Sequence, residues 1–96
     1  MTKDELLEKA NSLPLAPGVY LMHGKDGNVI YVGKAKKLKN RVSQYFQAGR
    51  GHNLKTHTMV GLVNDFDTII VGSEFEALVL ENALIKQYMP RYNILL

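Results

Sequence analysis

The sequence predicts one α+β domain that spans residues 1–96. A chain of 96 residues can bury a single modest hydrophobic core. An alternating apolar segment that is interrupted by a glycine-rich turn, residues 18–33, is typical of a β-hairpin. Apolar residues before and after this segment recur at the three- and four-residue spacing of amphipathic helices. Helices combined with an antiparallel hairpin in one short chain indicate the α+β class.

The first helix is expected over residues 3–12. Thr2 and Glu5 have the spacing of a capping box, in which each side chain accepts a hydrogen bond from the other residue's backbone N–H. Apolar residues then follow at helical spacing, and Pro14 and Pro17 end the helix.

The hairpin is expected to turn at residues 24–27, which have glycine at both ends. Pairing the strands about this turn gives Val19 opposite Val32, Tyr20 opposite Tyr31, and Leu21 opposite Ile30. Because side chains alternate between the faces of a strand, the four aliphatic residues then share one face. The two tyrosines lie together on the other face. A lone tyrosine on a strand is usually a packing residue, but a pair is a candidate site.

Three more elements follow the hairpin. Beyond Gly33, apolar residues at helical spacing predict a helix that ends at about Gln47; they are Ala35, Leu38, Val42, Tyr45 and Phe46. A weaker helix, interrupted by Gly61, is expected over residues 54–63. The β-branched run at residues 68–71 predicts the third strand.

The last helix is expected over residues 74–88, and a second capping-box pattern, Ser73 with Glu76, precedes it. Its apolar stripe consists of Ala77, Leu78, Leu84, Ile85 and Tyr88. Glu81 occupies the position that completes this stripe. Such a carboxylate is a member of a core salt bridge, a residue at the exposed edge of the stripe, or a functional acid, and the pattern leaves all three interpretations open.

Positive charge is concentrated in residues 27–64, which contain no acidic residue. The basic residues of this segment are Lys34, Lys36, Lys37, Lys39, Arg41, Arg50 and Lys55. Because the whole chain carries a net charge of +3 and this segment carries +7, the rest carries −4. A single lysine usually lies on a solvated helix face. A block of one sign repels itself unless a polyanion is present, so nucleic acid is the expected partner.

Arg41 is a second candidate residue. On the predicted helix, Lys34, Arg41 and Tyr45 are spaced by seven and four residues, which places them along one side. Spacing alone favours a rim arginine whose stem covers apolar surface. A functional role beside Tyr45 is the alternative.

Phosphodiester hydrolysis is a reaction that two tyrosines, an arginine, a lysine and one carboxylate near a basic surface could perform. A guanidinium and a divalent ion neutralise the charge of the phosphate as the attacking oxygen approaches. One carboxylate without an acidic companion suggests a single Mg²⁺ or Mn²⁺ that keeps several waters. A tyrosine could take the proton from the attacking water. Because its ordinary pKa is about 10, it needs cationic neighbours or a metal-bound water to act as a base at neutral pH.

Other kinds of site are not indicated. The chain has no cysteine, which excludes disulfides and thiolate metal sites. It has no apolar stretch long enough to span a membrane and no signal-peptide pattern, so we expect a cytoplasmic protein without membrane contacts. The isolated domain is expected to be a monomer. His23, His52 and His57 lack the spacing of a metal site and are interpreted as surface residues.

Four ordered blocks of the chain resemble the GIY-YIG nucleases, and within them the N-terminal domain of the UvrC subfamily. The signature is present as Gly18-Val19-Tyr20 and Tyr31-Val32-Gly33. The basic residues 34–41 with Tyr45-Phe46, the stretch at 76–82, and the ending at 90–93 are similar to the corresponding blocks of that subfamily. The resemblance covers nearly the whole chain.

This resemblance implies a small three-stranded antiparallel sheet flanked by helices. The active-site residues that it implies are Tyr20, Tyr31, Lys34, Arg41, Tyr45 and Asn93, with Glu81, not Glu76, binding one divalent ion. Arg41 would act on the scissile phosphate, and Tyr31 is favoured over Tyr20 as the general base. The residues expected to contact DNA are Lys36, Lys37, Lys39, Arg50 and Lys55.

The resemblance also implies a role in nucleotide excision repair. Damaged double-stranded DNA would be incised on the 3′ side of the lesion after loading by UvrB. The UvrB-contacting segment of that subfamily is absent here, so we expect a domain excised from the N-terminus of a longer protein. A free-standing small GIY-YIG nuclease and a non-catalytic DNA-binding module of the same fold are the alternatives. A degenerate module would be expected to lose Glu81 or Arg41, and the chain keeps both.

Overall fold

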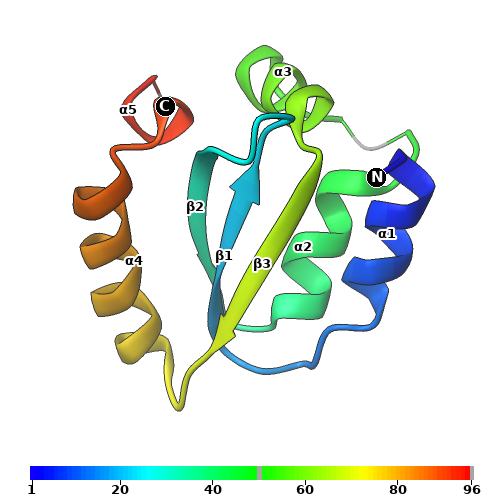
Figure 1. The fold of residues 1–96 in the computed structure, drawn as a ribbon. Helices are drawn as coiled ribbons and strands as arrows, with labels where there is room; N and C mark the ends of the chain where they lie inside the picture. The colour runs from blue at the N-terminus through cyan, green and yellow to red at the C-terminus, as the bar shows by residue number, and fades with distance from the viewer. Residues whose placement is uncertain (50, 96) are drawn as a thin grey trace.

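The computed structural model describes residues 1–49 and 51–95 and has three layers (Figure 1). The middle layer is an antiparallel sheet with the strand order β2-β1-β3. Its strands are β1 (Gly18–His23), β2 (Val29–Ala35) and β3 (Asp65–Ile70). The predicted α+β class and three-stranded antiparallel sheet are confirmed. The third strand begins ahead of the predicted residue 68, because its pairing with β1 continues back to Asp65.

The helices cover both faces of the sheet. They are α1 (Lys3–Asn11), α2 (Leu38–Phe46), α3 (Leu54–Leu62), α4 (Glu74–Tyr88) and α5 (Arg91–Leu95). In Figure 1, α4 lies against one face, α1 and α2 lie on the other, and α3 and α5 lie toward one end. Four of these helices were predicted; α5 is too short to show a helical period. Within the described part of the chain, no helix has the length and apolarity needed to cross a membrane.

The hairpin forms with a register that differs by two from the predicted one. The observed partners are Tyr20 with Gly33, Leu21 with Val32, and Met22 with Tyr31. The turn takes one extra residue, because the backbone N–H of Gly24 donates to Asn28. A β-bulge takes the second, because Ile30 is skipped in the pairing. Two single-residue shifts leave the alternation of side chains intact, so both tyrosines lie on one face as predicted.

The opposite face of the hairpin packs against α4. Val19, Leu21 and Val32 are buried there in a cluster with Ala77, which confirms the apolar face. Ile30 was predicted to share that face, and this prediction is wrong: the bulge turns Ile30 to the other side of the sheet. It packs there against the larger cluster, which contains the side chains of α1, α2 and α3.

The basic helix begins later than predicted. Strand β2 includes Lys34 and Ala35, and α2 starts at Leu38. Lys34 therefore does not share a helix side with Arg41 and Tyr45, contrary to the prediction. Ala35 fits both a strand and a helix pattern, which is why the spacing was misleading. Arg41 and Tyr45 lie one turn apart on α2, as predicted.

The capping box predicted at α1 is complete, whereas only one of the two hydrogen bonds of the capping box predicted at α4 is formed. Thr2 and Glu5 make the complete capping box at α1. At α4, the Ser73 hydroxyl accepts a hydrogen bond from the backbone N–H of Glu76 at 3.1 Å. The Glu76 carboxylate accepts instead from Gly72, at 3.0 Å. Glu76 thus stabilises the turn before α4, not the Ser73 backbone.

The buried stripe of α4 differs from the predicted one. Ala77 is buried, and Leu80, Leu84 and Ile85 pack with it against the sheet. Leu78 and Tyr88, which were predicted in the stripe, are 40% and 44% exposed. Because α4 carries apolar residues around most of its circumference, their period does not identify the buried side. Glu81 is half-buried, on the turn after Ala77.

Candidate active site

Tyr20 occupies its place because a glycine lies opposite it. The side chain is 1% exposed and lies over Gly33 of the neighbouring strand. A Cβ atom on Gly33 would be 2.7 Å from Cε2 of Tyr20 and would overlap the end of the phenol ring. The first signature tripeptide thus supplies the ring and the second supplies the space for it.

Three tyrosines from three elements meet on this face of the sheet. Tyr20 comes from β1, Tyr31 from β2 and Tyr45 from α2. The hydroxyl oxygens of Tyr20 and Tyr45 are 2.8 Å apart and share a hydrogen bond. The ring centroid of Tyr20 lies 6.3 Å from that of Tyr31 and 5.7 Å from that of Tyr45. The predicted tyrosine pair is therefore part of a three-ring cluster.

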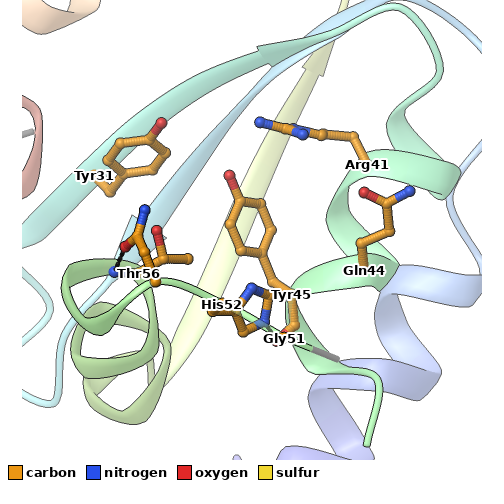
Figure 2. A pocket seen from close by; sticks show the side chains of 8 residues that line it. Tyr31, Arg41, Gln44, Tyr45, Gly51, His52 and Thr56 are labelled. Carbon is orange, nitrogen blue, oxygen red and sulfur yellow. Dashed lines mark hydrogen bonds between the residues drawn. The ribbon is translucent and has the colours of Figure 1, made fainter. Parts of the chain in front are cut away.

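Arg41 brings a fixed positive charge to the tyrosines. Its guanidinium carbon lies 5.7 Å from the ring centroid of Tyr45, one turn along α2. Figure 2 shows the guanidinium pointing toward the hydroxyls of Tyr31 and Tyr45. The hydroxyl of Tyr20, and then the charge interactions with Tyr20 and Tyr45, raise the pKa of Arg41. This arginine is therefore a permanent cation that is placed to meet an anionic substrate.

Burial makes the tyrosine hydroxyls harder to ionise. It is the largest cause that raises the pKa of Tyr20 well above its ordinary value, followed by the neighbouring Tyr45. Burial also raises the pKa of Tyr31 to about 12, with further upward contributions from Tyr45 and Glu81. Arg41 opposes this shift. Of the two signature tyrosines, Tyr31 is the more exposed and is the one that lines an open cavity.

That cavity, the tyrosine cavity, has a volume of about 300 Å³ and lies between α2 and the start of α3 (Figure 2). It is lined by Tyr31, Arg41, Gln44, Tyr45, Gly51, His52, Asn53 and Thr56. The lining is polar and aromatic. It therefore offers a place where a substrate can approach Tyr31, Tyr45 and Arg41 together.

A second cavity, the lysine cavity, lies on the other side of Arg41 and has a volume of about 570 Å³. Its lining residues are Lys34, Ala35, Lys36, Lys37, Asn40, Arg41 and Gln44. Lys34 reaches it from the end of β2, and Lys36 and Lys37 reach it from the loop before α2. Four cationic side chains around one depression form a surface that suits a phosphate backbone.

Glu81 approaches the site from α4. It belongs to none of the three ion pairs formed between described residues, which excludes a core salt bridge among them. Its negative charge is close enough to Tyr31 to contribute to the raised pKa of that phenol. Among described residues there is no cluster of three acidic or histidine side chains that could hold a metal. One carboxylate with several retained waters is nevertheless an arrangement that Mg²⁺ accepts, so Glu81 fits such an ion.

Asn93 has a structural role beside the site. Its side-chain amide donates to the carbonyl of Val32 and accepts from the backbone N–H of Val32, both at 2.8 Å. β2 is an edge strand, so this amide satisfies backbone groups that would otherwise face no strand. It also attaches α5 to the residue next to Tyr31. Asn93 thus contacts a neighbour of Tyr31, and its role in the active site stays a prediction.

The remaining residues expected to contact DNA do not line either cavity among the described residues. Lys39 is half-buried on α2, where its backbone N–H donates to Pro14, and it lies outside the described lining of both cavities. Lys55 is exposed on α3 and also lies outside them. Arg50 lies outside the described residues.

Four lining residues of the tyrosine cavity were missed by the sequence reasoning: Gln44, His52, Asn53 and Thr56. Gln44 follows Arg41 by one helical turn, so the helix period could have identified it. His52 was interpreted as a surface residue, and this interpretation is wrong. It is half-buried and stacks on Tyr45, with ring centroids 6.1 Å apart. Only the path of the loop before α3 brings it there.

The chain is similar to one family over most of its length. The model of the "UvrC-like GIY-YIG domain" family matches residues 16–94. UvrABC system protein C of Clostridium kluyveri is 62% identical over 84 residues, which cover 88% of this chain and 14% of that protein. Its counterpart in Caldanaerobacter subterraneus is 54% identical over 92 residues, 96% of this chain and 15% of that protein. The chain thus spans about one seventh of the length of these curated relatives.

Solved structures give the same result in three dimensions. The N-terminal GIY-YIG endonuclease domain of UvrC from Thermotoga maritima, bound to its catalytic magnesium, superimposes with a TM-score of 0.82 at 37% identity. The match covers 95% of this chain and 98% of that one. A tyrosine-to-phenylalanine point mutant of that domain, also bound to its catalytic divalent cation, gives 0.84 at 36% identity, with the same coverage.

Proposed function

The chain belongs to the family of UvrC-like GIY-YIG domains, and on this premise we propose that it is a divalent-metal-dependent endonuclease domain that hydrolyses DNA phosphodiester bonds. One observation carries the proposal: Arg41, Tyr31 and Tyr45 converge on one cavity. The magnesium-bound relative has the same fold over nearly its whole length, which supports Mg²⁺ or Mn²⁺ as the cofactor.

The substrate is proposed to be damaged double-stranded DNA. Within the full-length bacterial protein, the domain would make the 3′ incision of nucleotide excision repair in the cytoplasm. Loading by UvrB would use parts of that protein beyond this chain. The similarity to UvrABC system proteins that are about seven times longer supports this assignment. The lysine cavity supports DNA as the polymer that is bound.

Each of these residues is proposed to have its own role in phosphodiester hydrolysis. Arg41 would bind the scissile phosphate and stabilise its growing negative charge. A divalent ion held by Glu81 would supply additional positive charge at that phosphate. Lys34, at the end of β2, would hold the DNA strand in the lysine cavity together with Lys36 and Lys37.

Tyr31 is proposed to take the proton from the attacking water at its hydroxyl oxygen. It lines the cavity, whereas Tyr20 is 1% exposed and its hydroxyl is already hydrogen-bonded to that of Tyr45. With a pKa of about 12, Tyr31 is a poor base at neutral pH in the absence of a cation. The negative charge of Glu81 is one cause of that high pKa, so neutralising this charge would favour ionisation of Tyr31.

The test is a comparison of Glu81→Gln with the matched control Glu76→Gln. A glutamine at position 76 can still accept the hydrogen bond from Gly72, so that turn is kept. We expect Glu81→Gln to lose Mn²⁺ binding in calorimetry of the domain. It should also lose 3′ incision of a lesion-bearing duplex by the full-length protein with its loading partner. Equal incision by both variants would refute the role of Glu81, and metal-independent cleavage would refute the function.

A further inference from the structure

The two cavities of the site meet at the same pair of side chains. Arg41 and Gln44, one turn apart on α2, line both the tyrosine cavity and the lysine cavity. A DNA strand whose phosphate contacts Arg41 would therefore have one cavity on each side of that phosphate. The two flanking nucleotides would meet different chemistry.

The linings of the two cavities differ in kind. The lysine cavity carries Lys34, Lys36 and Lys37, which suit the charged backbone of the strand. The described lining of the tyrosine cavity contains no lysine or carboxylate, and beyond Arg41 its side chains are phenols, an imidazole, two amides and a hydroxyl. Amides and hydroxyls recognise the edges of nucleobases, and aromatic rings stack on their faces. Beside the phosphate that Arg41 would contact, the rest of the tyrosine cavity is therefore suited to a base.

His52 and Tyr45 form an aromatic wall in this cavity. Their rings stack with an interplanar angle of 25°, and both line the cavity (Figure 2). Nε2 of His52 lies 3.3 Å from the backbone carbonyl oxygen of Tyr45, a second contact that fixes the imidazole. His52 comes from the loop before α3, and nothing in the proposed hydrolysis requires it. A held aromatic ring beside the reacting groups indicates a role in binding the substrate.

We propose that the tyrosine cavity binds the base of one nucleotide next to the scissile phosphate, with His52 as part of its aromatic wall. This inference rests on the proposed function and specifies how its substrate lies. A volume of about 300 Å³ lies at the small end of the range for ligand pockets and suits a single base with part of its sugar. Gln44 and Thr56 also line the cavity, with an amide and a hydroxyl that can form hydrogen bonds to a base.

One consequence is that the base leaves its stack in the duplex. Unstacking and unpairing a base costs a few kcal/mol in general, and it costs least where pairing is already disturbed. The domain should therefore bind more tightly when the nucleotide that enters the cavity is unpaired. This preference for an unpaired nucleotide would apply on only one side of the scissile phosphate, the side that faces the tyrosine cavity. On the other side, the lysine cavity would hold the DNA backbone.

The test measures binding of DNA dinucleotides to the isotope-labelled 96-residue chain by NMR titration without a divalent ion. One dinucleotide has both bases, one lacks the 5′ base and one lacks the 3′ base. Removing one of the two bases should weaken binding about fivefold or more, the effect of losing one base–aromatic stack. Removing the other should change it less than twofold. The amide signals of Gln44, His52 and Thr56 should shift with the intact ligand.

Two variants and a control assign the effect to the aromatic wall. His52→Ala should abolish the difference between the dinucleotides, and His52→Phe should keep it. His57→Ala should also keep it, since His57 is exposed on α3 and lies outside the described lining. Equal binding of all three dinucleotides, no binding of any, or an undiminished difference in a folded His52→Ala would overturn the proposal. Because no incision is measured, failure here is distinct from failure of the nuclease assignment.

Discussion

The hydroxyl oxygens of Tyr20 and Tyr45 are 2.8 Å apart, and this contact joins the central strand of the sheet to α2. Tyr20 is almost fully buried, whereas Tyr45 lines the cavity. We therefore expect the buried phenol to position the one that lines the cavity. On this view the first signature tyrosine acts through Tyr45, whereas the second, Tyr31, lines the cavity itself.

Replacing Tyr20 with phenylalanine tests this relationship. Tyr20→Phe keeps the ring but removes the hydrogen bond, so the free energy of unfolding should fall by about 1 kcal/mol. Incision should fall less than in Tyr31→Phe, because the proposed base is still present. Denaturant unfolding and incision rates measure the two effects. Tyr88→Phe, at an exposed position on α4, is the control and should change neither. An incision defect as large as that of Tyr31→Phe would contradict the positioning role.

The glycine of the second signature tripeptide should tolerate no side chain. In Gly33→Ala the new methyl group would overlap the buried Tyr20 ring, so the variant should lose about 2 to 3 kcal/mol of stability through overpacking. Gly61→Ala is the matched control. No atom lies within 4 Å of the added Cβ in α3, and the substitution should stabilise by about 0.5 to 1 kcal/mol. Thermal unfolding compares them; a stable Gly33→Ala would refute the close approach.

Asn93 should stabilise the edge strand on which Tyr31 lies. Asn93→Ala removes two hydrogen bonds and leaves the N–H and C=O of Val32 without these partners, which should cost about 2 kcal/mol. Amide hydrogen exchange at Val32 should accelerate well beyond the change at Leu21. Asn82→Ala, exposed on α4, should leave this exchange unchanged. Unaltered protection of Val32 in Asn93→Ala would show that α5 is held by other contacts.

Stability should fall in alkaline solution through the buried tyrosines. The pKa of Tyr31 is raised to about 12 in the folded protein, above the ordinary value of about 10 that applies after unfolding. Below pH 10 the phenol is neutral in both states, and its contribution is complete. Between pH 10 and 12 the unfolded chain loses the proton first, so folding becomes less favourable. The melting temperature of wild type should therefore fall more steeply over this range than that of Tyr31→Phe. Identical slopes in wild type and Tyr31→Phe would contradict the shift.

The sequence predicted the faces of the hairpin better than its register. The face on which a side chain lies depends only on whether the register shift between the two strands is odd or even. The alternating apolar residues Val19, Leu21 and Val32 identify the buried face directly. The register depends on the turn and on the bulge at Ile30, which are small backbone choices without a strong sequence pattern. The same limit applies to the start of α2, where Ala35 suits either kind of element.

The site was predictable where a residue conflicted with its pattern. Glu81 stood out as a charge among apolar neighbours, and the structure places its charge near Tyr31 and outside the described ion pairs. His52 had no such signal, since its position depends on how the loop before α3 folds back on Tyr45. The sequence analysis thus identified Tyr31, Arg41 and Tyr45 on β2 and α2. It missed Gln44 on α2 and the residues that the loop and α3 bring to the cavity.

The bulge in β2 is a place where the hairpin can change length without changing the face on which Tyr31 lies. Ile30 has no partner on β1, so deleting it would straighten the strand while Tyr31 stays opposite Met22. A residue removed from the paired part of the strand would instead turn Tyr31 toward α4, and the cavity would lose its phenol. The distance along the chain between the two signature tyrosines is therefore free to vary by one at this position. Homologues with a shorter hairpin can keep the same chemistry, provided that the missing residue is the unpaired one.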